Sequence, residues 1–384
     1  MFSYSFDESV ISYGTAVAYM AYCFMQLGLN NTNTSSRVRI SINNTALTQL
    51  SQRKLKKGLS FLSFVFAVSL LYFLLNGGTG YFSDQFIYSM SEQDRFMGYV
   101  VQFINPIAMS IIALAFMLPN KKCFAFYFSI ALLLVYIAAI LSTGSRTYPL
   151  AMIIMAMFMY NDHVKKISAP KLAILGLAFL VVMVLAGSLR GSGELITTQK
   201  ISAEASEALT ERSENAFSFA NELIICNRNL YYLISSTDKV SYTFGITILG
   251  YFLGMVPFLP SLFMAVTGVP EYLLNSALYN TVLSTGPNYT KGLGTHAVAD
   301  IYICWGIIGV ILIFYFYGYL ITKLKSKGNL YATIAYYVIV SNAVYACRAS
   351  IFNLRAVLWT IIVVYIVMQL TGQSQKAKTI TNNV

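Results

Sequence analysis

Nine apolar runs, each near the length of a membrane-spanning helix, dominate the sequence and restrict the fold to one class. A helix needs about 20 apolar residues to cross the hydrocarbon core of a bilayer. The runs cover residues 9–29, 58–76, 97–118, 124–141, 147–160, 172–189, 298–322, 330–348 and 354–371. Charged residues make up 11% of the chain, whereas a soluble domain carries about 25%. We therefore expect a single all-α, polytopic membrane domain over residues 1–384, with about nine or more transmembrane helices.

The loops between these runs alternate in charge, and the alternation predicts which side of the membrane each loop faces. Five segments hold most of the 26 lysines and arginines and only one acid, Asp162. They are residues 30–57 and the segments that contain Lys121 and Lys122, Lys165 to Lys171, Lys323 to Lys327, and Lys376 and Lys378. Basic loops remain in the cytoplasm, so nine spans place the N-terminus outside and the C-terminus inside. The same loops explain the net charge of +11, which therefore does not indicate a nucleic-acid partner.

Residues 242–268 are apolar enough to cross the membrane, but we do not expect them to do so once. A single crossing would place the lysines after residue 322 outside, and Pro257 and Pro260 interrupt any helix there. We interpret the segment as a re-entrant or interfacial element within a long extracytoplasmic loop, residues 190–297. Irregular backbone is tolerated at that depth where protein or a watery cavity satisfies it. Two short crossings that form a hairpin are the alternative, and they keep the same sidedness.

The five cysteines do not form a metal-binding pattern. They lie at positions 23, 123, 226, 304 and 347, with no CxxC pair and no spacing typical of zinc sites. We therefore expect no disulfide framework, no bound metal and no cofactor.

Five arginines stand out on the predicted outer side, mostly at helix ends: Arg146, Arg190, Arg228, Arg348 and Arg355. Ionisable groups at membrane depth are costly and usually mark a substrate path. The guanidinium group stays charged and binds phosphate oxygens in a bidentate manner. We predict that these arginines share one anionic ligand, the phosphates of a lipid-linked substrate. The alternative is that each side chain extends separately to a membrane lipid headgroup.

His296 is one of two histidines in the chain and the only one on the predicted outer side. It follows a glycine-rich stretch and opens an apolar helix, and Asp300 lies one turn later on the same face. A neutral imidazole there could take a proton from a hydroxyl group while Asp300 orients the ring. The alternative is a residue that only forms local hydrogen bonds at the helix start. Gly306 and Gly309 follow, and small residues allow a neighbouring helix to approach closely.

Three motifs occur in a fixed order along the chain. They are Thr-Gly-Ser-Arg-Thr at 143–147, Gly-x-Thr…Pro at 245–257, and Gly-x-Gly-Thr-His-x-x-x-Asp-x-Tyr-x-x-x-Gly-x-x-Gly at 292–309. This order resembles the bacterial O-antigen polymerases (Wzy-type repeat-unit polymerases) and the related O-antigen ligases. The resemblance implies a metal-independent glycosyltransferase of GT-C-like fold at the periplasmic face of the inner membrane. It would transfer a growing glycan from undecaprenyl diphosphate to the next lipid-linked oligosaccharide repeat unit.

The resemblance also assigns roles to residues and partners. The base would be His296, and the diphosphate would be held by Arg146 and Arg190, then by Arg348 and Arg355. A chain-length regulator is the implied protein partner.

Two other functions remain open from the sequence. An O-antigen ligase would transfer the finished glycan to a lipid core or a protein, and a flippase or exporter would move the same anionic lipid-linked glycan. Many transporters show internal repeats, and we find none in this chain. The outer position of the polar residues also favours an enzyme over a transporter.

Overall fold

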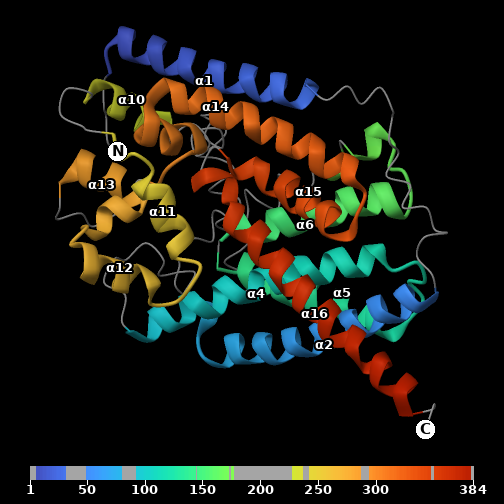
Figure 1. Cartoon of the computed structure of the whole chain (residues 1–384). Helices are drawn as coiled ribbons and strands as arrows, with labels where there is room; N and C mark the ends of the chain where they lie inside the picture. Colours follow the sequence, from blue (N-terminus) through green and yellow to red (C-terminus); the bar gives the residue numbers. More distant parts are fainter. Residues whose placement is uncertain are drawn as a thin grey trace, which may run out of the picture.

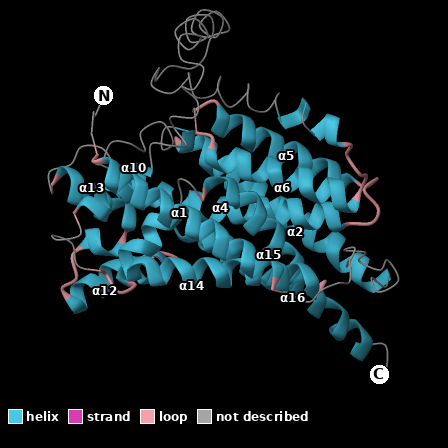
Figure 2. Cartoon of the chain, turned by 90° about the horizontal axis from the view of Figure 1, so that it is seen from above, coloured by secondary structure: helices cyan, strands magenta, loops and turns pink. Residues whose placement is uncertain are grey.

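The computed structural model describes residues 6–31, 49–79, 92–143, 145–172, 174–176, 227–236, 242–286, 294–346 and 350–381. All regular secondary structure within these ranges is helical (Figure 2). Six of the described helices are long and apolar enough to cross a membrane. They are α1 (Glu8–Asn30), α2 (Gln49–Leu75), α4 (Glu92–Met117), α5 (Phe124–Leu141), α14 (Ala297–Lys327) and α16 (Leu354–Thr381). The expected all-helical membrane fold is confirmed at this level.

Two further apolar runs form shorter helices. They are α6 (Thr147–His163) and α15 (Leu330–Asn342), and the short helix η2 (Ala343–Tyr345) continues α15. The run at 172–189 lies largely outside the described residues. The number of nine crossings therefore stays a prediction.

The segment predicted to be re-entrant forms two short helices, α11 (Ile246–Leu253) and α12 (Leu259–Thr267). Their 8 and 9 residues reach only about 12 and 14 Å at 1.5 Å per residue, far short of a hydrocarbon core of about 30 Å. Phe258, with φ of 66°, turns the chain between them, and Pro260 lies in the first turn of α12, where its missing N–H leaves no hydrogen bond unmade. These lengths favour the re-entrant or interfacial interpretation over two crossings.

The rest of the long loop is described only in part. It contains α10 (Asn227–Ser235), η1 (Glu271–Leu274) and α13 (Ser276–Thr285). Residues 194–222 of this loop lie outside the described residues.

The long helices form a bundle and a pair beside it (Figure 1). Helices α2, α4, α5, α6, α15 and α16 pack against one another, and α14 joins them through α15 while α1 lies along α14. Tyr136 of α5 is fully buried in the bundle. Its ring meets Phe66 and Phe73 edge to face, and its hydroxyl donates to Asn105 Oδ1 of α4 at 2.8 Å. The buried hydroxyl is thus satisfied within the apolar core.

Two glycines bring the backbones of α1 and α14 into direct contact. A Cβ at Gly28 would lie 2.0 Å from the carbonyl oxygen of Tyr315, and a Cβ at Gly318 would lie 2.2 Å from that of Met25. Thr322 Oγ1 donates to the carbonyl of Leu29 at 3.0 Å across the same interface. Any side chain at either glycine would separate the helices, so this pair depends on small residues.

Helix α14 breaks at Gly306, whose φ and ψ are 62° and −149°. The break frees the carbonyls of Ile303 and Cys304, which accept the backbone N–H groups of Thr243 and Phe244 at 3.0 and 3.2 Å. The segment just before α11 thereby satisfies backbone groups that the membrane could not. The close neighbour at Gly306 is therefore this segment, with the hydroxyl of Tyr242 nearest, and not a helix as the sequence suggested.

Candidate active site at the start of α14

His296 is the N-cap of α14 and its side chain is buried, with 4% of its surface exposed. Its Nδ1 accepts the backbone N–H of Ala299 at 3.5 Å, and the next residue, Ala297, donates its N–H to the carbonyl of Ala346 at 2.9 Å. A neutral imidazole that accepts at Nδ1 carries its proton on Nε2. That Nε2 is buried and has no hydrogen-bond partner among the described residues.

Burial also sets the charge of this ring. It lowers the pKa of His296 to about 4, because a charged imidazolium is poorly solvated away from water. The side chain is therefore neutral at pH 7, the state in which an imidazole can accept a proton.

Asp300 is fully buried one turn after His296. Its Oδ2 accepts the hydroxyl of Ser350 at 2.9 Å, which joins α14 to the short helix η3 (Ser350–Asn353). The ring of His296 is held instead by the N–H of Ala299, and its hydrogen bonds with described residues do not include Asp300. The two residues share a helix face and Oδ2 of Asp300 accepts from Ser350, so an orienting role of Asp300 for the imidazole stays a prediction.

Arg355, in the first turn of α16, contacts Tyr251 of the loop helix α11, and Figure 1 shows where these two helices lie. Its Cζ lies 4.4 Å from the centroid of the Tyr251 ring, and its Nη2 donates to the carbonyl oxygen of Tyr251. Its Nε is buried and has no partner among the described residues. The guanidinium thus keeps donor capacity that the fold does not use.

Arg146 immediately precedes α6 and is half-buried. Two residues on, the phenol of Tyr148 interacts electrostatically with Arg355, and Tyr251 interacts in the same way with Asp300. The starts of α6, α14 and α16 therefore gather around the end of α11.

Of the remaining three arginines, the structure describes only one. Arg228 lies in the first turn of α10 and is half-buried. Its neighbour Asn229 donates to the carbonyl of Gly294 at 2.9 Å, so α10 contacts the backbone just before His296. Arg190 and Arg348 lie outside the described residues, although Ala346 and Ser350 on either side of Arg348 both contact the first turn of α14.

Sequence reasoning missed the uncharged members of this region, Tyr251, Ser350 and Asn353. Tyr251 falls inside the motif at 245–257, so the position of that motif was the one available signal. Ser and Asn side chains in a polar turn carry no comparable signal.

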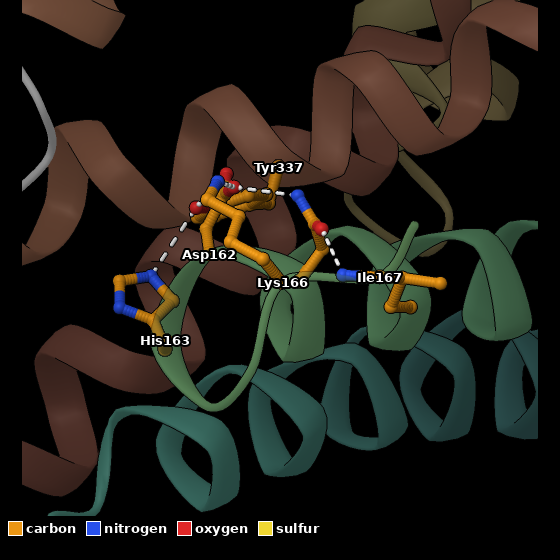
Figure 3. A network of polar contacts seen from close by, with 6 residues as sticks. Asp162, His163, Lys166, Ile167 and Tyr337 are labelled. Atoms are coloured by element: carbon orange, nitrogen blue, oxygen red, sulfur yellow. Dashed lines mark hydrogen bonds and ion pairs between the residues drawn. The ribbon is translucent and has the colours of Figure 1, made fainter. Parts of the chain in front are cut away.

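The second histidine belongs to a polar network at the opposite end of α6 (Figure 3). The hydroxyl of Tyr337 donates to Asp162 Oδ2 at 2.9 Å and lies 3.2 Å from His163 Nε2, while Lys166 pairs with Asp162 at 3.0 Å. Burial lowers the pKa of His163 although Asp162 opposes the shift. The network fastens the end of α6 to α15, so His163 has a structural role here.

The family model described as O-antigen polysaccharide polymerase Wzy matches residues 2–376. The chain belongs to the Wzy O-antigen polymerase family. The match covers nearly the whole sequence, and the apolar helices agree with the membrane location of Wzy polymerases, which act on lipid-linked oligosaccharide repeat units. No curated protein and no solved structure gave a match, so the GT-C-like fold of this Wzy polymerase stays a prediction. In the described part of the chain, no three His, Cys, Asp or Glu side chains are grouped as metal ligands would be.

Proposed function

We propose that this Wzy polymerase transfers the growing glycan from undecaprenyl diphosphate to a hydroxyl of the next lipid-linked repeat unit, at the periplasmic face of the bacterial inner membrane and without a metal ion. What supports the proposal is a buried imidazole at the start of α14 and a guanidinium at the start of α16 whose Nε–H is unpaired among the described residues, two helix starts connected through η3 and α11. Base and anion binder are the two groups that this reaction requires.

The reaction is one displacement at the anomeric carbon of the donor. The acceptor oxygen bonds to that carbon, the bond from the carbon to the diphosphate oxygen breaks, and undecaprenyl diphosphate leaves. The hydroxyl proton passes to His296. Negative charge therefore develops on the diphosphate as positive charge develops on the imidazole.

His296 needs two adjustments to act as the base. The proton on Nε2 must move to Nδ1, and the 3.5 Å contact with Ala299 is at the long limit for a hydrogen bond, so little stabilisation is lost. An anionic diphosphate beside the ring also favours the imidazolium and raises its pKa from about 4 towards neutrality. The substrate would thus activate its own base.

The arginines stabilise the departing diphosphate in this proposal. Arg355 contributes its free Nε–H, and Arg146 approaches from the start of α6. Arg190, Arg228 and Arg348 are assigned to the same ligand from their predicted outer positions and, except for Arg228, from the family resemblance. Fixed charge aimed at developing charge is often the largest catalytic effect, and loss of one donor costs roughly a hundredfold or more in kcat. A chain-length regulator is a further proposed partner, on the resemblance alone.

The test is polymerisation of purified lipid-linked repeat units by the purified enzyme in nanodiscs. We expect His296→Ala to lower kcat by about a hundredfold or more, the usual range for loss of a general base, and Arg355→Ala to do the same. His163→Gln, at the far end of α6, is the matched histidine control and should polymerise normally. Full activity of His296→Ala would refute the assignment of the base. A product ladder on the carrier lipid identifies a polymerase, whereas one transfer to another acceptor identifies a ligase and translocation without a new bond identifies an exporter.

A further inference from the structure

We infer that Tyr251 of α11 is a positioning residue that holds the guanidinium of Arg355 in line with the departing diphosphate. This inference rests on the proposed function and adds an uncharged residue of the outer loop to the site.

Tyr251 holds Arg355 through three separate contacts. Its ring lies under the guanidinium at 4.4 Å, its carbonyl oxygen accepts from Nη2, and its hydroxyl accepts the backbone N–H of Arg355 at 3.2 Å. One residue therefore fixes both the main chain and the charged end of the arginine. A flexible side chain held at both ends has few conformations left to lose when a ligand binds.

The contacts restrain Arg355 without neutralising it. No carboxylate of the described residues pairs with its guanidinium, and the ring and carbonyl of Tyr251 are both uncharged. An acidic partner would have held the side chain equally well, but it would also have repelled a diphosphate. A tyrosine gives the orientation and leaves the positive charge for the substrate.

Tyr251 is itself anchored to the bundle. Its hydroxyl donates to Asn353 Oδ1 at 3.2 Å, and Asn353 Nδ2 donates to Asn342 Oδ1 of α15 at 2.8 Å. Asn353 has φ of 53°, a left-handed conformation that asparagine tolerates better than most residues. Gln102 of α4 donates to the carbonyl of Gly254 at 3.0 Å and fixes the end of α11. The position of Arg355 is thus fixed by α4 and α15 through their hydrogen bonds to α11 and Asn353.

The experiment measures kcat and KM for polymerisation by the full-length enzyme in nanodiscs. Tyr251→Leu removes the ring and the hydroxyl, and we expect kcat to fall about tenfold or more as the cation–π contact and two hydrogen bonds are lost. KM should change less than threefold, because the diphosphate gains further negative charge as it leaves and the orientation of Arg355 matters most at that step. Tyr251→Phe keeps the ring and should lower kcat about fivefold. Tyr272→Leu, which removes a partly exposed tyrosine of the same loop, is the control and should match wild type.

A double-mutant cycle separates positioning from a general structural effect. If Tyr251 acts through Arg355, adding Tyr251→Leu to Arg355→Ala lowers kcat no further, within about twofold. An additive loss overturns the inference, and so does wild-type kcat in Tyr251→Leu. If the leucine variant does not fold, the phenylalanine variant takes its place in the cycle and wild-type kcat in it has the same meaning.

The same measurements distinguish this inference from the proposed function. Wild-type kcat in Arg355→Ala refutes the role of Arg355 in the reaction itself. A slow Arg355→Ala beside a normal Tyr251→Leu refutes only the positioning by Tyr251.

Discussion

His296 combines a structural and a chemical role, and its buried position makes a prediction about pH. Its pKa in the free enzyme is about 4, below the ordinary value of about 6.5. The neutral form therefore persists as the pH falls from 6.5 and is lost only near pH 4. Because kcat/KM reports on the free enzyme, we expect the midpoint of its acid limb well below pH 6.5. The acid limb of kcat should have its midpoint at a higher pH, since the bound diphosphate favours the imidazolium.

The measurement is the pH dependence of polymerisation between about pH 4 and 8, with His296→Gln as the variant that should lose this limb. A kcat/KM limb at or above pH 6.5 that depends on His296 would contradict a buried, neutral imidazole in the free enzyme.

The sequence was enough to predict which titratable residues belong to the candidate site, but not which uncharged residues contact them. His296 and Arg355 are conspicuous because an ionisable group beside an apolar run is rare. Tyr251 is one of 28 tyrosines, and only the packing of α11 on α16 distinguishes it. The hydrogen bond from Ser350 to Asp300 was missed for the same reason. A shared helix face shows which residues of one helix are neighbours, but not which residue of another element donates to a carboxylate.

Helix packing depends on single small residues, and the α1–α14 pair offers a direct test. We expect Gly28→Ala and Gly318→Ala each to destabilise the protein by roughly 1–3 kcal/mol, the usual range for overpacking. The added methyl would meet a backbone carbonyl at 2.0 or 2.2 Å, which no side-chain movement can relieve. Thermal unfolding in detergent measures the effect. Gly176→Ala, where no atom lies within 4 Å of the new Cβ, should leave Tm unchanged or slightly higher, and equal Tm values for all three variants would contradict the close contact.

The sequence indicated close approach at Gly306 and Gly309, yet α1 meets α14 at Gly318. A glycine in an apolar run shows that close approach is allowed, but the partner and the face are decided by tertiary packing. The break at Gly306 was equally hidden, because it depends on the two N–H groups that residues 243 and 244 supply.

For the whole molecule, length and apolarity were the reliable signals. Eight of the nine apolar runs form helices within the described residues, because crossing a bilayer demands length whatever the packing. The arrangement of those helices could not be predicted, since lipid-facing and buried apolar faces have the same composition. The exposed rings of Phe64, Phe124 and Tyr19 illustrate this.

The orientation of the molecule in the membrane can be predicted from one helix, α14, because His296 and a lysine cluster lie at its opposite ends. The 31 residues of α14 span about 46 Å if straight, more than a bilayer core of about 30 Å. His296 lies at one end and Lys323, Lys325 and Lys327 lie at the other. Since basic ends remain in the cytoplasm, we expect the imidazole to face the periplasm. Tyr251 interacts electrostatically with Asp300 of α14 and with Arg355 of α16, and Tyr148 of α6 interacts in the same way with Arg355. We therefore expect the starts of α6 and α16 on that same side.

Single cysteines in a variant without the five native cysteines test this orientation in intact cells with a membrane-impermeant maleimide. We expect a cysteine at Thr285, at the end of α13, to react from outside, and one at Lys325 to react only after the membrane is opened. Labelling of the Lys325 position from outside would show that α14 has the opposite orientation and that His296 faces the cytoplasm. A glycan assembled in the periplasm could not then reach the base, so this one result bears on the orientation and the chemistry together.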